Sequence, residues 1–201
     1  MNDDAARKEL QRICSRSYER NLTVSAGGNM SVRIDDGILI TPSGRNKGML
    51  CSSDMVKVSM DGRPIGSGRP SIETGMHLAL YRKNSSVNAV VHCHPLYCTA
   101  LAVRGEKVKS SLTPEGILLL GDVPMVRYIT PGSAELADAV SECSDSVAIL
   151  LERHGAVTQG NTLEEAYNRM EELEFQAHLQ MITEGADCLP AAEIAKIRGM
   201  K

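Results

Sequence analysis

Two of the five histidines in this chain stand one residue apart, as His92-Cys93-His94, at the end of an apolar run. Side chains alternate between the two faces of a strand, so His92 and His94 share one face and both imidazoles can reach one ion. A third histidine, His154, ends a second apolar run and precedes Gly155, which lets the backbone turn closely. Three imidazoles with an open coordination position are typical of a catalytic zinc site, although cobalt, manganese or iron would suit the same ligands.

A simpler interpretation of these histidines stays open. HxH pairs also arise by chance at strand edges, and His154 would then be an ordinary surface-loop residue. Both histidine elements, however, follow the two most hydrophobic predicted strands, at residues 87–92 and 147–151. This context favours the metal interpretation.

Glu73 and His77 lie one helical turn apart in a helix predicted from about residue 72 to 82, for which Ser71 is a suitable N-cap. Spacing alone makes Glu73 a first-turn carboxylate that favours the helix dipole. His77 is either a partner of a metal ligand or a structural histidine. His178 is expected to lie on the face of a long C-terminal helix.

Three short segments of small residues are candidates for binding an anion. They are Gly27-Gly28-Asn29, Ser43-Gly44 and Ser71. Each is also typical of an ordinary turn. Together they offer backbone N–H groups and hydroxyls that could bind a phosphate, and both interpretations remain open.

The elements that must position these residues follow from hydrophobic spacing and turn signals. Helices are predicted at about residues 4–19, 72–82, 95–103, 133–143, 162–184 and 190–198, and strands at 30–34, 38–41, 55–59, 87–92 and 147–151. Residues 104–127 are predicted to be mostly loop and strand. Because tight turns join several strands, we expect an α/β or α+β arrangement with helices on both faces of a largely antiparallel or mixed sheet.

Composition is that of an ordinary globular protein, with 42% hydrophobic and 23% charged residues, and the length of 201 residues predicts a single domain spanning residues 1–201. The net charge of -3 supplies no broad basic field, so neither nucleic acid nor a membrane is an expected partner. The acidic start, the lack of a long apolar run and six cysteines without a CxxC pair predict a cytoplasmic protein with free thiols.

Taken in order, several motifs resemble the class II aldolase/adducin-head family. They are AGGNMSVR at 26–33, TPSG at 41–44, PSIE at 70–73 with His77, VVHCH at 90–94 and His154-Gly155. The resemblance runs from about residue 5 to residue 180. Within the family the chain is most similar to the short archaeal-type L-fuculose-1-phosphate aldolases, which LTPEG at 112–116 also resembles.

The resemblance implies a three-layer α/β/α fold around a mainly antiparallel sheet, assembled as a homotetramer with sites between neighbouring subunits. It implies that His92, His94 and His154 bind zinc. Glu73 would cap the metal in the empty site and act as general base once substrate displaces it. The implied phosphate-binding residues are Gly28, Asn29, Ser43, Gly44 and Ser71.

The resemblance also implies an activity, the reversible cleavage of a ketose 1-phosphate such as L-fuculose 1-phosphate. The products are dihydroxyacetone phosphate and a small aldehyde such as lactaldehyde. Cleavage beside a ketone leaves an enediolate, whose charge a chelating dication stabilises as a Lewis acid. Glu73 would move the proton.

Two departures from the family pattern bear on this activity. Ile72 stands where many relatives have a second hydroxyl residue. Bacterial aldolases of the family use tyrosines from the loop after the HxH helix and from the C-terminal tail, whereas this chain has Thr113-Pro114-Glu115 in that loop and no tyrosine after Tyr167. The acid that protonates the aldehyde oxygen is therefore unassigned, and Glu115 is the candidate.

Other activities of the same family remain alternatives. They are pentulose-5-phosphate 4-epimerase, phosphosugar dehydratase and oxo-acid phosphate decarboxylase. A non-catalytic adducin-like binding module is a further alternative of a different class. Retention of all three histidines and of Glu73 favours an enzyme.

Overall fold

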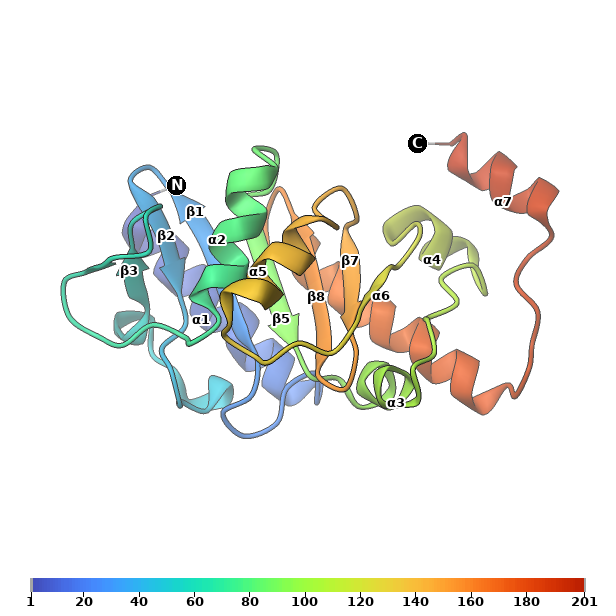
Figure 1. The fold of residues 1–201 in the computed structure, drawn as a ribbon, viewed down its shortest axis with the longest axis horizontal. Coiled ribbons are helices and arrows are strands. Elements are labelled where there is room, and N and C mark those ends of the chain that lie inside the picture. The colour runs from blue at the N-terminus through green and yellow to red at the C-terminus, as the bar shows by residue number, and fades with distance from the viewer. Residues whose placement is uncertain (1, 201) are drawn as a thin grey trace.

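The computed structural model describes residues 2–200, and within that range the strands form one eight-stranded sheet in the order β4-β3-β2-β1-β5-β8-β7-β6 (Figure 1). The strands are β1 (Asn29–Ile34), β2 (Gly37–Ile40), β3 (Val56–Val58), β4 (Pro64–Ile65), β5 (Ala89–Cys93), β6 (Met125–Val126), β7 (Ala148–Leu151) and β8 (Gly155–Gly160). Every neighbouring pair is antiparallel except β6 and β7, which are parallel. The predicted mainly antiparallel sheet is confirmed.

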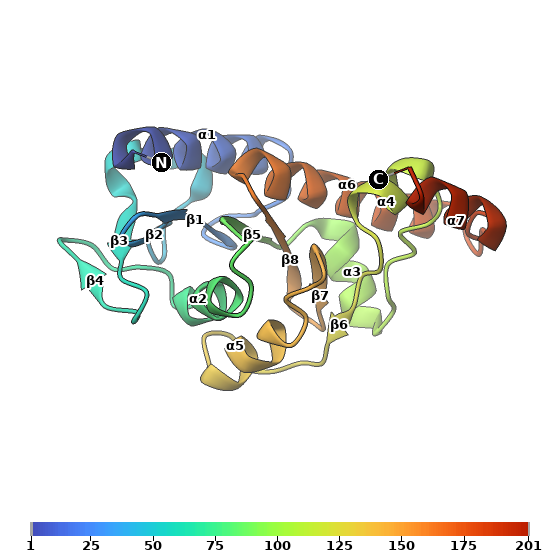
Figure 2. The same ribbon diagram turned by 90° about the horizontal axis from the view of Figure 1, so that it is seen from above.

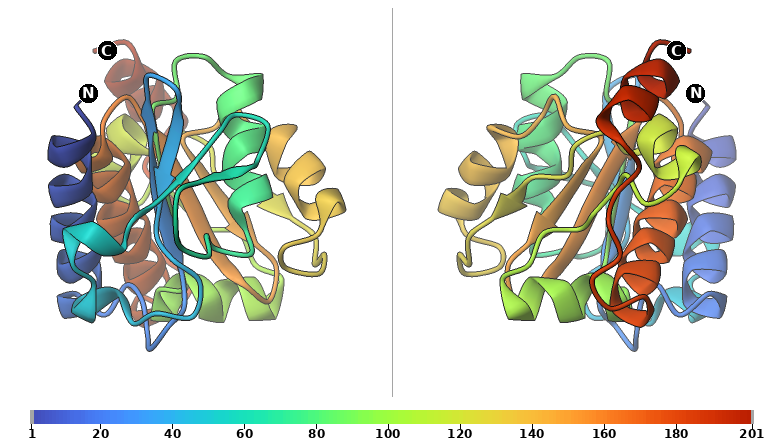
Figure 3. Two further views of the ribbon diagram at one scale, coloured as in Figure 1. Left: turned by 90° about the vertical axis from the view of Figure 1, so that its left-hand side faces the viewer. Right: turned by 90° about the vertical axis from the view of Figure 1, so that its right-hand side faces the viewer.

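Helices cover both faces of this sheet, as Figures 2 and 3 show. They are α1 (Asp3–Glu19), α2 (Thr74–Lys83), α3 (Leu96–Arg104), α4 (Pro114–Leu119), α5 (Ala134–Ser141), α6 (Leu163–Ile182) and α7 (Ala191–Arg198), with short 3-10 turns η1 (Lys47–Met49) and η2 (Ser52–Asp54). The α1 and α6 helices lie on one face, and α2 and α5 lie on the other. The result is the expected three-layer α/β/α arrangement. No helix within residues 2–200 has the length and apolar character needed to cross a bilayer.

Two hydrophobic clusters fix β5 in place from opposite sides. Val91 belongs to the cluster under α1 and α6, whereas Val90 belongs to the cluster under α2 and α5. All five residues of β5 are buried, which explains why its sequence is a continuous apolar run rather than an alternating one. Burial of each large aliphatic side chain contributes about 1.5–3 kcal/mol. The strand end that carries His92 therefore has a rigid support.

The start of α2 differs from the prediction. The helix begins at Thr74 rather than residue 72, and its N-cap is Glu73 rather than Ser71. A turn precedes it, in which the Thr74 N–H donates to the Ser71 carbonyl at 3.1 Å and the Glu73 N–H donates to the Ser71 hydroxyl at 3.3 Å. Serine competes for the backbone in this way at helix starts. The turn moves Glu73 out of the first helical turn.

Besides the two-residue strand β4 and the short 3-10 turns, the sequence reasoning missed α4 and β8. The stretch 104–127 contains α4, because the Thr113 hydroxyl accepts from the Gly116 N–H and Pro114 opens the helix. Strand β8 follows His154 directly and is buried at all six positions, so it lacks the alternation that marks a half-buried strand. Glycine at both of its ends further masked it.

Candidate metal centre

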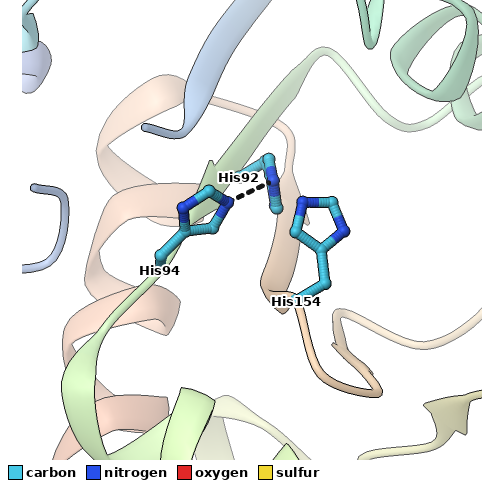
Figure 4. Close-up of side chains that lie close together, drawn as sticks. All are labelled: His92, His94 and His154. Atoms are coloured by element: carbon cyan, nitrogen blue, oxygen red, sulfur yellow. Dashed lines mark hydrogen bonds between the residues drawn. The ribbon is translucent and has the colours of Figure 1, made fainter. Parts of the chain in front are cut away.

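The three histidines predicted to bind one metal converge at one end of the sheet (Figure 4). His92 is on β5, His94 follows the end of that strand, and His154 lies in the turn between β7 and β8. Strand β8 pairs with β5 on one side and β7 on the other, which brings this turn beside the end of β5. The Nε2 atoms of His92 and His94 are 3.1 Å apart, and one ring nitrogen from each of the three residues lies within 4.8 Å of the others.

Two glycines allow the backbone to pack closely around the histidine pair. A Cβ on Gly155 would lie 2.4 Å from the Cys93 carbonyl oxygen and 2.7 Å from Cδ2 of His94. Gly28 has a φ of +70°, and a Cβ there would lie 2.6 Å from the His92 carbonyl oxygen. All three distances are shorter than any ordinary contact of a Cβ atom. Gly155 is thus required for close approach, and not only for turning the chain.

Hydrogen bonding fixes which nitrogen of His92 faces its neighbours. Its Nδ1 is 2.9 Å from the Ala156 carbonyl, which can only accept, so Nδ1 carries the proton. When the ring is neutral, Nε2 then presents a lone pair toward His94. Metal-binding histidines are commonly oriented in this way, by donating the other ring N–H to a backbone carbonyl. Burial, with His92 nearby, lowers the pKa of His94 to about 3 and that of His154 to about 4. Both rings are neutral near pH 7.

Glu73 lies against the same histidines. Its Oε2 is 3.2 Å from Nε2 of His92, and its Oε1 is 3.5 Å from Nε2 of His154. Burial works to raise the pKa of Glu73, but His92, a hydrogen bond from Asn29 and His154 outweigh it and hold the pKa well below its usual range. The side chain is therefore a carboxylate, and its buried Oε1 has no hydrogen-bond partner within residues 2–200.

These donor atoms fit a divalent metal ion. Lone pairs of neutral imidazole nitrogens and of a carboxylate would repel one another in a buried site unless a cation lies between them. Two nitrogens bound to one tetrahedral zinc ion are separated by about 3.3 Å, given Zn–N bonds of about 2.0–2.1 Å. The 3.1 Å between His92 and His94 is close to that value. His154 and Glu73 would complete the set of ligands.

A buried chain of hydrogen bonds runs from Glu73 through Asn29 and His77 to Ser31 and Tyr81. Asn29 donates from Nδ2 to Oε2 of Glu73 at 2.8 Å, and its Oδ1 accepts from Nε2 of His77 at 2.5 Å. Nδ1 of His77 is 2.6 Å from the Ser31 hydroxyl, which is 2.7 Å from the Tyr81 hydroxyl. Burial lowers the pKa of His77 to about 3, which keeps the ring neutral. His77 is thus a partner of Asn29, and Asn29 orients Glu73.

A cavity of about 370 Å³ opens beside the histidines. All of the residues predicted to bind phosphate line it, namely Gly28, Asn29, Ser43, Gly44 and Ser71, together with Glu73, His94 and His154. The backbone N–H groups of Gly44 and Ile72 donate to no acceptor among the residues that the structure describes. They are available to an anion in this cavity.

Comparison with known proteins identifies the family to which this chain belongs. Residues 8–181 match the sequence pattern of the family described as "Class II Aldolase and Adducin N-terminal domain". The chain belongs to this family. It is 42% identical over 180 residues to the L-fuculose phosphate aldolase of Methanococcus vannielii, an alignment that covers 90% of this chain and 98% of that protein. The predicted family membership is confirmed.

Two further comparisons extend over nearly the whole chain. The 3-oxo-tetronate 4-phosphate decarboxylase of Escherichia coli K12 is 38% identical over 204 residues, which cover 98% of this chain and 96% of that protein. The crystal structure of YgbL from Escherichia coli superposes with a TM-score of 0.92 at 37% identity and covers 98% of this chain and 99% of that chain. The family's fold is thus the fold of this chain.

Of the predicted site residues, only Glu115 lies away from the metal centre and its cavity in this chain. It is exposed in the first turn of α4, which packs against α6 and α7, and it does not line the cavity. His178 lies on α6 as expected and stacks on Tyr97 with ring centroids 3.8 Å apart.

The sequence reasoning missed Lys47, which is 1% exposed and lines the cavity. A lysine in a loop is usually a solvated surface residue, so its type and spacing gave no signal.

Proposed function

We propose that this chain is a zinc-dependent aldolase that cleaves a ketose 1-phosphate resembling L-fuculose 1-phosphate. The observation that supports this most directly is the convergence of three histidines and Glu73 beside a cavity with unpaired backbone N–H donors. The fuculose phosphate aldolase of Methanococcus vannielii, at 42% identity, supports the choice of substrate.

The residues of the chain have separate tasks in this proposal. His92, His94 and His154 would hold the metal, which when bound supplies the positive charge that draws electrons from the substrate carbonyl. Loops at Gly28, Ser43–Gly44 and Ser71 would bind the phosphate and so fix the position of the ketose chain.

Proton transfer falls to Glu73 in this reaction. Cleavage breaks the bond between C3 and C4 of the ketose 1-phosphate and leaves the electron pair on the phosphate-bearing fragment. Glu73 lies at the cavity wall, held by Asn29. In the condensation direction its carboxylate removes a proton from C3 of dihydroxyacetone phosphate, and in cleavage the resulting carboxyl group returns that proton to C3. The hydroxyl on C4 must lose its proton as the aldehyde forms, and this needs a second group.

A specific observation favours decarboxylation of an oxo-acid phosphate as a second candidate. Among the described residues that line the cavity, Glu73 is the only carboxylate and there is no tyrosine. Loss of carbon dioxide requires no base on the leaving fragment, so one proton-transfer residue is enough. The decarboxylase of Escherichia coli K12, which aligns over 98% of this chain, is consistent with this chemistry.

Product analysis with the zinc-loaded protein distinguishes these reactions. The panel contains L-fuculose 1-phosphate, a 3-oxo-tetronate 4-phosphate and ribulose 5-phosphate, with dihydroxyacetone phosphate, carbon dioxide and xylulose 5-phosphate as the measured products. Dihydroxyacetone phosphate from the first substrate supports the aldolase. Carbon dioxide from the second alone would replace it with the decarboxylase, and turnover of ribulose 5-phosphate alone would replace it with the epimerase. Absence of both bound metal and turnover would indicate an adducin-like binding module.

We further propose a homotetramer in which a neighbouring subunit completes the site. Several large apolar side chains near the cavity are exposed in the single chain, including Val24 at 67%, Met49 at 75% and Ile72 at 60%. Contact with a neighbouring subunit would bury these side chains. Sedimentation equilibrium tests the assembly, and a monomer that retains full activity would exclude a shared site.

A further inference from the structure

Lys47 is a buried cation in the wall of the cavity. It opens the η1 turn and is 1% exposed, although lysine is rarely buried without an ionic partner. The cavity that it lines also contains Ser43, Gly44 and Ser71. Its position places a positive charge next to the loops that the proposed function assigns to phosphate.

The Lys47 ammonium joins two of these loops. Nζ donates to the Ala26 carbonyl at 2.9 Å and to the Arg45 carbonyl at 2.8 Å. Ala26 precedes Gly27-Gly28, and Arg45 follows Gly44, so the two bonds link the first loop to the second. A lysine ammonium has three N–H donors. The third has no acceptor among the residues that the structure describes.

No group close to Lys47 balances its charge. Within residues 2–200 no carboxylate lies within ion-pair distance of Nζ, whereas Lys57 pairs with both Asp3 and Asp36. The nearby thiols of Cys14 and Cys93 stay neutral because burial raises the pKa of each, that of Cys14 to about 12. Two carbonyl oxygens supply only partial negative charge. Burial therefore lowers the pKa of Lys47, and an anion bound beside Nζ would stabilise the charged form.

We propose that Lys47 binds the phosphate group of the substrate and supplies the positive charge of the anion site. The inference rests on the proposed function for the identity of the substrate, and it adds a cation to a pocket otherwise built from neutral N–H and hydroxyl donors. A dianionic phosphate in the cavity accepts the third N–H of Lys47 and neutralises the buried ammonium. The two carbonyl bonds meanwhile hold the loops at the spacing that the phosphate needs.

The test compares ligands that differ only in the phosphate. Zinc-loaded wild-type protein and Lys47→Met are titrated by calorimetry with inorganic phosphate, dihydroxyacetone phosphate and dihydroxyacetone. A hydrogen bond to a charged group corresponds to roughly 10- to 100-fold in affinity. We expect Lys47→Met to lose that much affinity for both phosphate ligands, with dihydroxyacetone binding and zinc content unchanged. Lys57→Met serves as the matched control and should bind phosphate as the wild type does.

Two results would overturn the inference. The first is a phosphate affinity of Lys47→Met within twofold of that of the wild type. The second is a loss of affinity for dihydroxyacetone as large as the loss for the phosphate ligands, which would mean that Lys47 only supports the loops. Should Lys47→Met not fold, Lys47→Gln keeps an amide NH₂ donor group without the charge and gives the same comparison. Failure of the proposed function is separable, because wild-type protein would then bind inorganic phosphate through Lys47 yet cleave no ketose phosphate.

Discussion

Replacing Gly155 by alanine tests whether close backbone packing sets the geometry of the metal centre. The new Cβ would lie 2.4 Å from the Cys93 carbonyl oxygen and 2.7 Å from Cδ2 of His94, where ordinary contacts begin at 3.4 Å. The backbone or the His94 ring must therefore move by about 0.7–1 Å to reach that contact distance. Gly155 pairs with Leu151 at the start of β8, and the next residue, Ala156, pairs with Cys93, so the ladders on both sides resist the shift.

The expected cost appears in two measurements. Metal–ligand distances in proteins hold within about 0.2 Å, so displacement of His94 should weaken zinc binding by about 10- to 100-fold. Overpacking of this kind also costs about 1–3 kcal/mol in the free energy of unfolding. Competition with a chromophoric zinc chelator gives the affinity, and urea denaturation of the metal-free protein gives the stability.

Gly75→Ala is the matched control for this substitution. Gly75 lies in α2 two residues after Glu73, and a Cβ there would meet only the Ala137 side chain at 3.9 Å. Alanine in a helix interior stabilises by about 0.5–1 kcal/mol relative to glycine. If Gly155→Ala bound zinc as tightly as Gly75→Ala and unfolded at the same urea concentration, the inferred steric role of Gly155 would be refuted.

Three other predictions address the ligands and their support. His94→Ala should lose bound zinc and activity while remaining folded, as measured by atomic absorption and circular dichroism, because His94 lies beyond the end of β5. Glu73→Gln should retain zinc but lose about 10²- to 10⁴-fold in turnover, as expected for removal of a general acid–base residue; undiminished turnover would exclude that role. The pKa of His77 is about 3 in the folded protein, below its unfolded value, so protonation favours unfolding as the pH falls below about 6.5. Between pH 7.5 and 5 the metal-free wild type should lose about 2 kcal/mol more stability than His77→Gln, measured by urea denaturation, and equal losses would contradict the assignment.

Local sequence patterns were sufficient for those parts of the site that depend on neighbouring residues. The apolar run before His92 predicts a buried strand, and alternation along it predicts that His92 and His94 face the same way. The burial of all five residues of β5 confirms the first expectation, and the 3.1 Å between the two Nε2 atoms confirms the second. Ser133 and Thr162 were recognised as helix starts because capping is a contact between residues two or three apart.

Tertiary structure decided the contacts between residues that are distant in the sequence. His154 reaches His92 only because β8 lies between β5 and β7, and strand order is not encoded in the periodicity of any one strand. Asn29 was predicted to bind phosphate, and it lines the cavity, but it also donates to Glu73 from 44 residues away. Glu115 was proposed as an acid from its place in the sequence, yet α4 packs against α6 and α7 instead of lining the cavity.

The features that the sequence predicted and those that only the fold decided differ in the range of the interactions that cause them. Hydrophobic periodicity, capping and turn preferences act over a few residues, so the sequence by itself determined the strand that ends at the histidine pair, the starts of α5 and α6 and the types of residue able to bind a metal. The burial of Lys47, the orientation of Glu73 and the approach of Gly155 to Cys93 depend on how the strands pair and how the loops pack against them. Only the folded chain fixes these distances.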